Sequence, residues 1–288
     1  MLIINKFLLD LLFKDRDISL FLYQCLFSKE DETTLKYEFD IDGHEILYSF
    51  SFDGNKFLEE TLQLDNQPVI ERIGKNAKLW LSENSTFHEV DESILFIKKV
   101  YFNTKFEDNE MLKKWFAFLK QSICINAYKR TISSYNDESL TLRKYLEKYG
   151  VEEINSFLKN NNFKYSVEYA LEIEGKGIRY EMSEEEGKTL FFKREDISVP
   201  IPLFFESTGN KTLINILPAI LHSVQKGGLL VIDEFSSGFH NKLEELIIRY
   251  IMNNSTNTQM LLVSHSTNLL SNALLRPDQV YSVEMMGG

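Results

Sequence analysis

The apolar and polar positions of the chain follow two periods, which separate helical segments from strands. Residues 2–27 carry apolar side chains at helical spacing, interrupted by the charged run KDRD. Residues 34–103 alternate between apolar and polar positions and contain the turn signals DG and DGN, which predict antiparallel hairpins. Helical spacing returns over 108–162, including the stretch EMLKKWFAFLKQSICINAY, and residues 165–194 predict another hairpin.

After the sequence PIP the pattern becomes that of an alternating α/β fold. We expect a helix over 208–226, kinked at Pro218, and then an apolar strand over 229–233. An amphipathic helix over 241–253 leads to a second apolar strand, QMLLVSH, at 259–265. Near-continuous apolar strands joined by a helix predict a parallel sheet covered on both faces.

The fold class predicted from these elements is α/β, with a parallel sheet, an antiparallel β subdomain and a helical insertion. We expect three segments along the chain. Residues 1–107 form an N-terminal helix and the antiparallel β subdomain, 108–165 the helical insertion, and 166–288 a C-terminal α/β lobe.

The charge, the cysteine spacing and the N-terminal sequence make several classes of protein less favoured. The 288 residues include 32 basic and 43 acidic side chains, and this net charge of −11 disfavours nucleic-acid binding through bulk charge. Cys25 and Cys124 show no CxxC or Cys/His spacing, which indicates a reduced, intracellular chain. Charged residues interrupt the apolar N-terminal stretch, so we predict neither a signal peptide nor a membrane span, and expect a cytoplasmic protein without a membrane partner.

One local region reverses this charge. Residues 97–130 contain eight basic and three acidic residues, interleaved with aromatic side chains. Such a pattern is compatible with a patch that faces DNA or a protein partner. The favoured interpretation is that the aromatic rings belong to the core and the lysines to a solvated face.

The clearest candidate chemistry lies where the two apolar strands end. Asp233 and Glu234 follow the first strand and His265 ends the second. Carboxyl ends of parallel strands meet at one edge of a sheet, where ligands bind. At such an edge Asp233 would hold Mg²⁺, Glu234 would orient or deprotonate the attacking water, and His265 would meet the γ-phosphate of a nucleotide.

Each of these motifs also has a structural interpretation. The Asp-Glu pair can be a helix N-cap and a first-turn acid, and a histidine at a strand end is often structural. Ser207, Thr208 and Gly209 fall at the start of the helix over 208–226. They form either a simple cap or an anion site, because free amides and the helix dipole favour a phosphate there.

The order of ESTGNK, GGLLVIDEFSSGFH, LLVSHSTNLL and LRPDQVY resembles the C-terminal half of the ABC-type ATPase domain of OLD-like and abortive-infection ATPases. These are relatives of the SMC-type head and occur in bacterial anti-phage defence. The resemblance is strong over 204–284 and weaker over 34–130. It implies ATP and Mg²⁺ as cofactors, a homodimer that encloses ATP between two protomers, and an associated effector such as a nuclease or toxin.

The resemblance also implies roles for individual residues. ESTG matches the family's signature loop, so Ser207, Thr208 and Gly209 would contact nucleotide held by the partner protomer. LLVIDE matches Walker B, which gives Asp233 to the metal and Glu234 to the water, and VSH matches the switch histidine, His265. SSGFH matches the D-loop, which would place Ser236, Ser237 and His240 at the dimer seam.

A phosphate loop of the form G-x-x-x-x-G-K-[ST] is not found in the 288 residues. EEEGKT at Gly187 follows three acids and lies in a hairpin pattern, and IGKNAKL at Gly74 lacks the first glycine. TGNKTL is already assigned to the signature loop. We therefore expect a fragment or split product of a longer ATPase that begins just downstream of its phosphate loop.

Three function classes remain after this comparison. The first is an ABC-type ATPase subunit that drives an effector. The second is a catalytically incomplete scaffold or interaction protein that retains the fold. The third, a metal nuclease using Asp233 and Glu234, ranks last because no Asp-x-Asp or Glu-x-Lys accompanies the acidic strand.

Overall fold

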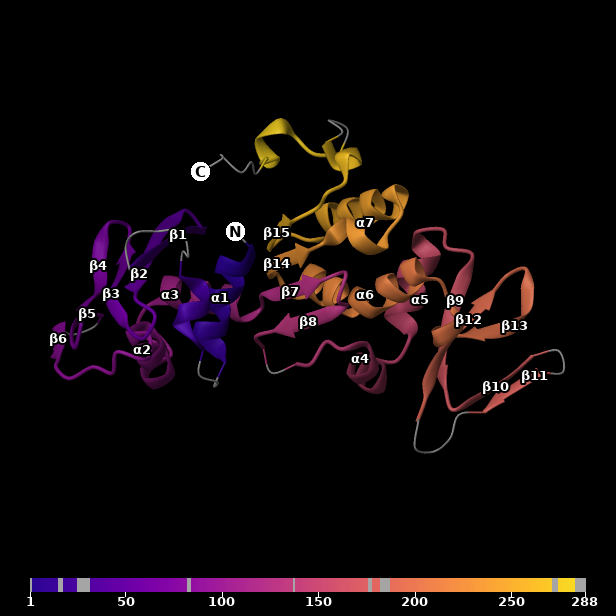
Figure 1. Ribbon diagram of the computed structural model, residues 1–288, viewed down its shortest axis with the longest axis horizontal. Coiled ribbons are helices and arrows are strands. Elements are labelled where there is room, and N and C mark those ends of the chain that lie inside the picture. Colours follow the sequence, from indigo (N-terminus) through magenta and orange to yellow (C-terminus); the bar gives the residue numbers. More distant parts are fainter. Residues whose placement is uncertain are drawn as a thin grey trace. The chain divides into compact units, whose positions relative to one another are not determined.

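The computed structural model describes most of the chain and divides it into two compact units. The residues described are 2–14, 18–24, 32–81, 84–136, 138–175, 178–181, 187–270 and 274–282. Unit 1 comprises Met1–Lys120 and unit 2 comprises Gln121–Gly288 (Figure 1). The three segments expected from the sequence stay a prediction.

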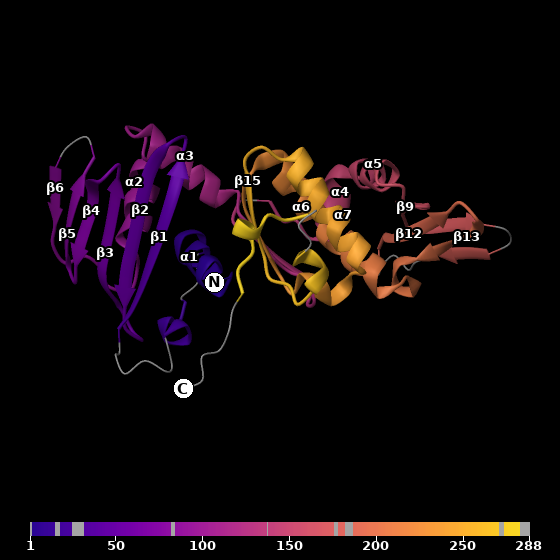
Figure 2. The same cartoon turned by 90° about the horizontal axis from the view of Figure 1, so that it is seen from above.

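Unit 1 is built on a six-stranded sheet in which every strand pairs antiparallel with its neighbour in the chain, in the order β1 to β6 (Figure 2). The strands are β1 Thr33–Ile41, β2 His44–Phe52, β3 Phe57–Leu64, β4 Gln67–Ile73, β5 Asn76–Trp80 and β6 Asn84–Phe87. The helices are α1 Leu2–Phe13, η1 Leu20–Tyr23, α2 Phe96–Thr104 and α3 Glu110–Lys120. The antiparallel hairpins predicted for this region are confirmed.

The N-terminal helix is shorter than the predicted span of residues 2–27. It ends at Phe13, and a single 3₁₀ turn, η1, follows at Leu20–Tyr23. The charged run KDRD comes directly after Phe13, so the apolar face that α1 buries is complete before it. The prediction of one helix over this whole span is therefore wrong. Cys25 lies outside the described residues.

A buried ion pair ties sheet and helix together in unit 1. The side chains of Glu60 on β3 and Arg72 on β4 are fully buried, with Oε2 of Glu60 3.7 Å from Nη1 of Arg72. Glu60 also accepts hydrogen bonds from the backbone amides of Phe96 (2.6 Å) and Ile97 (2.9 Å), the first residues of α2. Glu60 thus satisfies the free amides at the start of α2, although burial raises its pKa above the ordinary value.

Unit 2 contains the α/β elements. Its strands are β7 Ile123–Asn126, β8 Thr131–Ser134, β9 Tyr165–Ala170, β10 Glu172–Gly175, β11 Ile178–Glu181, β12 Thr189–Arg194, β13 Ile197–Pro202, β14 Gly228–Asp233 and β15 Thr258–Leu262. Its helices are α4 Leu142–Tyr149, α5 Glu152–Asn160, η2 Leu203–Phe205, α6 Thr208–Lys226, η3 Phe235–Gly238, α7 Asn241–Asn254, η4 Thr267–Leu270 and η5 Pro277–Gln279.

The central sheet of unit 2 has the strand order β15-β14-β7-β8. β14 pairs parallel with both β15 and β7, and β8 returns antiparallel beside β7. The predicted helix around Cys124 is wrong, because α3 ends at Lys120 and the next residues form β7. Four residues are too few to show a strand period, and their apolar side chains continue the spacing of the preceding helix. Cys124 is buried on this strand, with its Sγ 3.9 Å from the hydroxyl of Tyr135.

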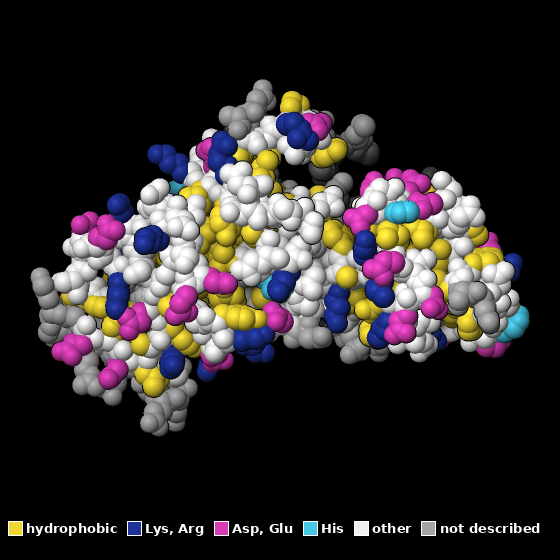
Figure 3. Space-filling model, turned by 180° about the vertical axis from the view of Figure 1, so that it is seen from behind, with side chains coloured by type: hydrophobic (Ala, Val, Ile, Leu, Met, Phe, Trp, Pro, Cys, Tyr) yellow, Lys and Arg dark blue, Asp and Glu magenta, His cyan; other side chains and the backbone are white. Residues whose placement is uncertain are grey.

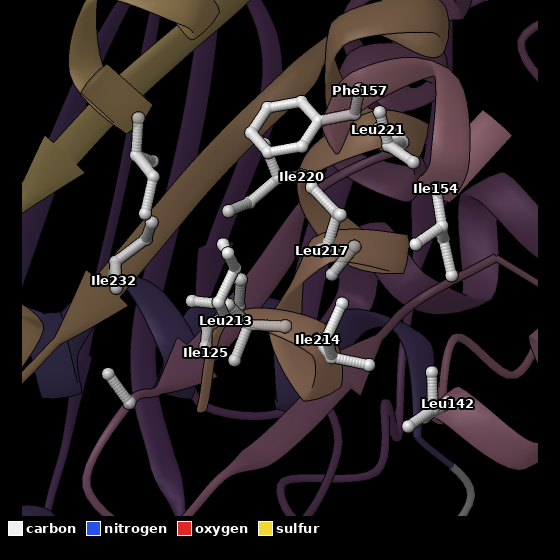
Figure 4. Close-up of a cluster of buried hydrophobic side chains, with 14 of the residues drawn as sticks. Ile125, Leu142, Ile154, Phe157, Leu213, Ile214, Leu217, Ile220, Leu221 and Ile232 are labelled. Atoms are coloured by element: carbon white, nitrogen blue, oxygen red, sulfur yellow. The ribbon is translucent and has the colours of Figure 1, made fainter. Parts of the chain in front are cut away.

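Helix α6 forms the centre of the unit 2 core. Its apolar face, which includes Leu213, Leu217 and Ile220, packs with Ile125 of β7 and Ile232 of β14 (Figure 4). Residues from α4 and α5 complete this cluster. The helix spans 208–226 as predicted and continues through Pro218, whose buried ring belongs to its packed face.

Two glycines make the sharp turn from α6 into β14. Gly227 and Gly228 have φ of +82° and +95°, a conformation that other residues rarely adopt. A Cβ atom at Gly227 would stand 2.7 Å from the backbone oxygen of Asn257, so the close approach also excludes a side chain. The turn reverses the direction of the chain from α6 into β14. The N-terminal end of α6 therefore lies toward the carboxyl end of β14.

The hairpin predicted for residues 165–194 is more elaborate in the structure. β9 pairs antiparallel with β12, β13 adds a third strand, and β10 pairs with β11 as a separate ribbon. The two sequences that resemble part of a phosphate loop, IGKNAKL and EEEGKT, each lead into a strand. Gly74 is in the turn between β4 and β5, and β12 begins two residues after Gly187, so neither precedes a helix.

β15 is an edge strand of the central sheet. Among the described strands its one neighbour is β14, and the other side of its backbone carries no strand. Met260, Leu261 and Leu262 are only partly buried there, whereas the apolar residues of β14 are fully buried. No described helix is both long and apolar enough to cross a lipid bilayer.

Candidate nucleotide hydrolysis site

The acidic edge of unit 2 is centred on Asp233, the last residue of β14. Its Oδ2 accepts a hydrogen bond of 3.1 Å from Nδ2 of Asn126, which ends the neighbouring parallel strand β7. The backbone oxygen of Asp233 accepts another, of 2.9 Å, from the amide of Ala127. Asp233 and Asn126 are therefore held at matching positions of adjacent strands.

Sequence reasoning missed Asn126 because the strand that carries it was predicted as helix. A usable signal was present in ICIN, a short apolar run that ends in an amide residue, as LLVIDE ends in carboxylates. The run alone does not distinguish a strand from a helix segment.

Glu234 adopts an unusual backbone conformation. Its φ of 54° and ψ of 38° place it in the left-handed region, which costs about 1–3 kcal/mol for a residue with a side chain. Its Oε2 accepts a 2.8 Å hydrogen bond from Oγ of Ser237, whose amide also donates to the Glu234 carbonyl at 2.9 Å. Such strain persists where the surrounding structure fixes it, and it concentrates at functional sites.

The cap interpretation of the acidic pair finds no support in these contacts. Helix α7 begins at Asn241 with His240 as its N-cap residue, so Asp233 and Glu234 do not lie in its first turn. Glu234 precedes the short helix η3, but its side chain makes no capping hydrogen bond to that helix. Both carboxylates are partly exposed at the sheet edge and accessible to a ligand.

His265 is brought to the same edge by the end of β15. The Val263 amide donates to Ile232 (2.9 Å), and the Phe235 amide donates to the Val263 carbonyl (3.0 Å), which locks the two strand ends together. The His265 amide then donates to Oγ of Ser236 at 3.2 Å. β15 itself ends at Leu262 and not at His265 as predicted, so the exposed histidine lies in the loop after the strand.

The predicted signature loop lies at the start of α6. Ser207 is the N-cap residue, and its Oγ accepts a 3.3 Å hydrogen bond from the amide of Asn210. The amide of Ser207 is already occupied, because it donates to Oε1 of Glu206 at 2.8 Å. The amides of Thr208 and Gly209 make no hydrogen bond within the described part of the chain, so these two are available to an anion.

Glu206 is a buried acid that sequence reasoning did not single out. Arg194 of β12 binds both of its oxygens through Nη2, at 2.9 and 2.7 Å. Burial favours the neutral carboxyl, but the hydrogen bonds from the Ser207 amide and from Arg194 outweigh it and lower the pKa of Glu206. Its negative charge therefore compensates part of the positive end of the α6 dipole.

The structure gathers some predicted site residues and separates others. Asp233, Glu234, Ser236, Ser237 and His265 lie together at the ends of β14 and β15, where hydrogen bonds join Glu234 to Ser237 and Ser236 to His265. His240 is exposed at the start of α7, and no described hydrogen bond joins it to this group. Ser207, Thr208 and Gly209 likewise have no described hydrogen bond to the acidic edge.

The donor set of the edge is suited to Mg²⁺. This ion is usually held by one or two carboxylates together with phosphate oxygens and waters. Asp233 supplies a partly exposed carboxylate whose orientation is fixed by Asn126. Among the described residues no group of three His, Cys, Asp or Glu side chains is placed to hold a metal ion by itself.

Comparisons with known proteins bear on what this edge does. A family model described as "AAA domain, putative AbiEii toxin, Type IV TA system" matches residues 20–271. The chain belongs to this family. This membership supports ATPase activity as the general function. It also confirms the expected resemblance to abortive-infection ATPases and the predicted nucleoside-triphosphatase fold of unit 2. Among curated proteins, none matches the chain.

Two solved structures from the SMC group are similar to this AAA-family chain. The SMC head domain from Thermotoga maritima has 13% identity and a TM-score of 0.41, over 84% of this chain and 67% of that one. The SMC head bound to the C-terminal winged-helix domain of ScpA has 11% identity and a TM-score of 0.47, over 94% and 80%. Both scores are below 0.5, so the family assignment rests on the sequence model alone.

Several aromatic rings of the basic and aromatic stretch at 97–130 belong to the core, as the favoured interpretation predicts. Phe106, Trp115 and Phe116 are fully buried. Acidic and basic side chains are interspersed on the face shown in Figure 3, without a large patch of one sign. Two aromatic residues of the stretch are exceptions, because Phe102 and Tyr128 are 49% and 70% exposed.

Proposed function

We propose that this chain is the ATP-binding and ATP-hydrolysing subunit of a cytoplasmic bacterial anti-phage defence system, in which it drives or gates an associated effector. The family to which the chain belongs supports the ATPase part of this proposal. The observation that carries the assignment of residues is the acidic edge, where Asp233 is oriented by Asn126 and the adjacent Glu234 is held in a left-handed conformation.

In the proposed reaction water attacks the γ-phosphate of ATP and releases ADP and phosphate. Glu234 orients the water and accepts its proton, while His265 donates a hydrogen bond to the γ-phosphate. Asp233 would hold Mg²⁺, with Asn126 as the residue that positions its carboxylate. When bound, the ion neutralises negative charge that develops on the phosphate oxygens.

The proposal includes a second protomer and a phosphate loop from outside these 288 residues. Thr208 and Gly209 would present their free amides to nucleotide held by the partner, with Ser236, Ser237 and His240 near the dimer seam. The loop G-x-x-x-x-G-K-[ST] would come from another segment, since the 288 residues lack it. That lack favours the alternative function, a scaffold that keeps the ATPase fold without turnover.

One substitution tests the proposed function. The chain is tagged and purified from its host with its bound partners, and Mg²⁺-dependent ATP hydrolysis is compared between the unsubstituted protein and Glu234→Gln. We expect turnover to fall about 10²–10⁴-fold while ATP binding is retained, because glutamine keeps the shape but cannot accept a proton. Glu245→Gln, an exposed acid on α7, is the control and should leave turnover unchanged.

The same assay separates the two candidate functions. Equal hydrolysis by the unsubstituted and Glu234→Gln assemblies would make Glu234 a structural residue and remove the proposed mechanism. An unsubstituted assembly that neither binds nor hydrolyses ATP would instead support the scaffold. The defence role is tested by plaque counts, which should rise in cells that carry Glu234→Gln if hydrolysis drives the effector.

A further inference from the structure

The turn between β7 and β8 presents an aromatic ring and a cation that the fold itself does not use. It runs from Asn126 to Arg130, and Tyr128 at its tip is 70% exposed. Neither the Tyr128 ring nor the Lys129 ammonium has a hydrogen-bond, ionic or aromatic partner within the described part of unit 2. An exposed ring is common, but here it stands beside a lysine in a turn whose first residue, Asn126, donates a hydrogen bond to Asp233.

Both ends of the turn are fixed to the candidate site. At one end Asn126 donates to Oδ2 of Asp233, while its own Oδ1 accepts a 2.8 Å hydrogen bond from the Lys129 amide. At the other end Nε of Arg130 donates to Oγ1 of Thr212, in the second turn of α6, at 3.2 Å. The tip therefore stands between the acidic edge and the beginning of α6, in a backbone that needs little further ordering to bind.

The chemistry of this tip fits a nucleotide. An aromatic face stacks on a nucleobase, and an ammonium pairs with phosphate oxygens. A polynucleotide fits less well, because proteins that bind duplex DNA commonly neutralise about 6–10 phosphates, whereas this turn offers Lys129 and Arg130 alone. The net charge of −11 also opposes a long polyanion more than a small one complexed with Mg²⁺.

We propose that the β7–β8 turn is a nucleotide-contacting element, in which Tyr128 stacks on the base and Lys129 pairs with the phosphates of the triphosphate bound at the acidic edge. This inference rests on the proposed function and adds residues to it. Asn126 links the two parts, since the residue that orients Asp233 also shapes the turn. Binding of the nucleotide at the tip and positioning of the carboxylate are thereby joined through one side chain.

The test measures nucleotide affinity and not turnover. A fluorescent ATP analogue is titrated, with Mg²⁺, into the assembly purified from its host, and unlabelled ATP or tripolyphosphate is used as competitor. Tyr128→Ala should weaken ATP binding about fivefold to hundredfold and leave tripolyphosphate unaffected, because only ATP has a base to stack. Lys129→Ala should weaken both competitors about fivefold to tenfold. Tyr128→Phe should bind normally, since stacking needs the ring and not the hydroxyl.

Tyr281→Ala is the matched control, because Tyr281 is 80% exposed and should not alter affinity for either competitor. Unchanged ATP affinity in Tyr128→Ala, or an equal loss for ATP and tripolyphosphate, would overturn the stacking role. If turn variants bind normally while Asp233→Asn binds weakly, this inference fails and the proposed function stands. If the unsubstituted assembly shows no saturable binding up to millimolar ATP, both fail.

Discussion

At the scale of single residues, Glu244 shows the cost of a charge inside a packed helix. It lies in the first turn of α7 with 1% of its surface exposed, and its Oε2 has no hydrogen-bond partner among the described residues. A buried carboxylate without a partner is destabilising, and the favourable helix dipole at this position offsets only about 0.3–1 kcal/mol.

We therefore expect Glu244→Leu to stabilise the protein, by about 1–3 kcal/mol, because a residue of similar volume replaces a buried carboxyl group with an oxygen that has no partner among the described residues. Urea unfolding followed by circular dichroism measures the change. Glu245→Leu is the control, since Glu245 is exposed and pairs with Arg249, and its effect should stay within about 0.5 kcal/mol. A lower urea midpoint for Glu244→Leu would show that the carboxylate is paired in solution.

Asp233 and Asn126 illustrate what sequence can and cannot provide at this scale. Asp233 and Glu234 were predictable because they end a long apolar run, where ligands of parallel sheets bind. Asn126 was not, since its importance depends on β7 lying beside β14, a pairing between segments about a hundred residues apart. The ion pair of Glu60 and Arg72 joins directly opposed residues of the consecutive strands β3 and β4, and its burial was not predicted from the sequence.

At the scale of elements, prediction succeeded where the pattern was long. α6 was predicted to the residue and α7 to within one residue, because 14 to 19 residues give several turns of apolar spacing. The four-residue strand β7 failed, and the three-stranded sheet of β9, β12 and β13 was only partly anticipated. Short strands are defined by their neighbours, which the sequence does not reveal.

The N-terminus of α6 allows a prediction about assembly. Ser207→Arg would place a bulky cation beside the free amides of Thr208 and Gly209, while it removes a cap worth about 1 kcal/mol. We expect the chain to remain folded and ATP-dependent dimerisation to fail. Light scattering is measured with ATP on the Glu234→Gln assembly, with and without Ser207→Arg, and Ser207→Thr serves as a control that keeps the cap. Equal dimer fractions would reduce ESTG to an ordinary cap.

At the scale of the whole molecule, stability should respond to pH through His222, which is buried near the C-terminal end of α6. Its Nε2 lies 2.9 Å from Nδ2 of Asn136 and 3.3 Å from Oε1 of Gln121, and its Nδ1 lies 3.6 Å from Oε2 of Glu138. Burial lowers the pKa of His222 below its ordinary 6.5, and Lys226 and Lys148 act in the same direction against the carboxylate of Glu138.

Because the unfolded chain binds this proton more readily, the free energy of unfolding should fall as pH drops below about 6.5, by at most about 1.4 kcal/mol per pH unit for one proton. Urea unfolding from pH 7.5 to 5.5 measures the slope. His222→Gln, which cannot titrate, should give a flatter curve over this range. Two parallel curves would mean that His222 has the same pKa in the folded and unfolded states.

The open side of β15 has a consequence for how the purified chain behaves at high concentration. An apolar strand with unpaired amides and carbonyls is a template for edge-to-edge pairing between molecules, and no charged or proline residue interrupts β15 to prevent it. We expect concentration-dependent aggregation of the isolated chain, and Leu261→Lys should reduce it by placing a charge on the edge. Turbidity is measured against protein concentration for Leu261→Lys and for the unsubstituted protein. Equal turbidity in the two samples would mean that the edge is already covered in solution.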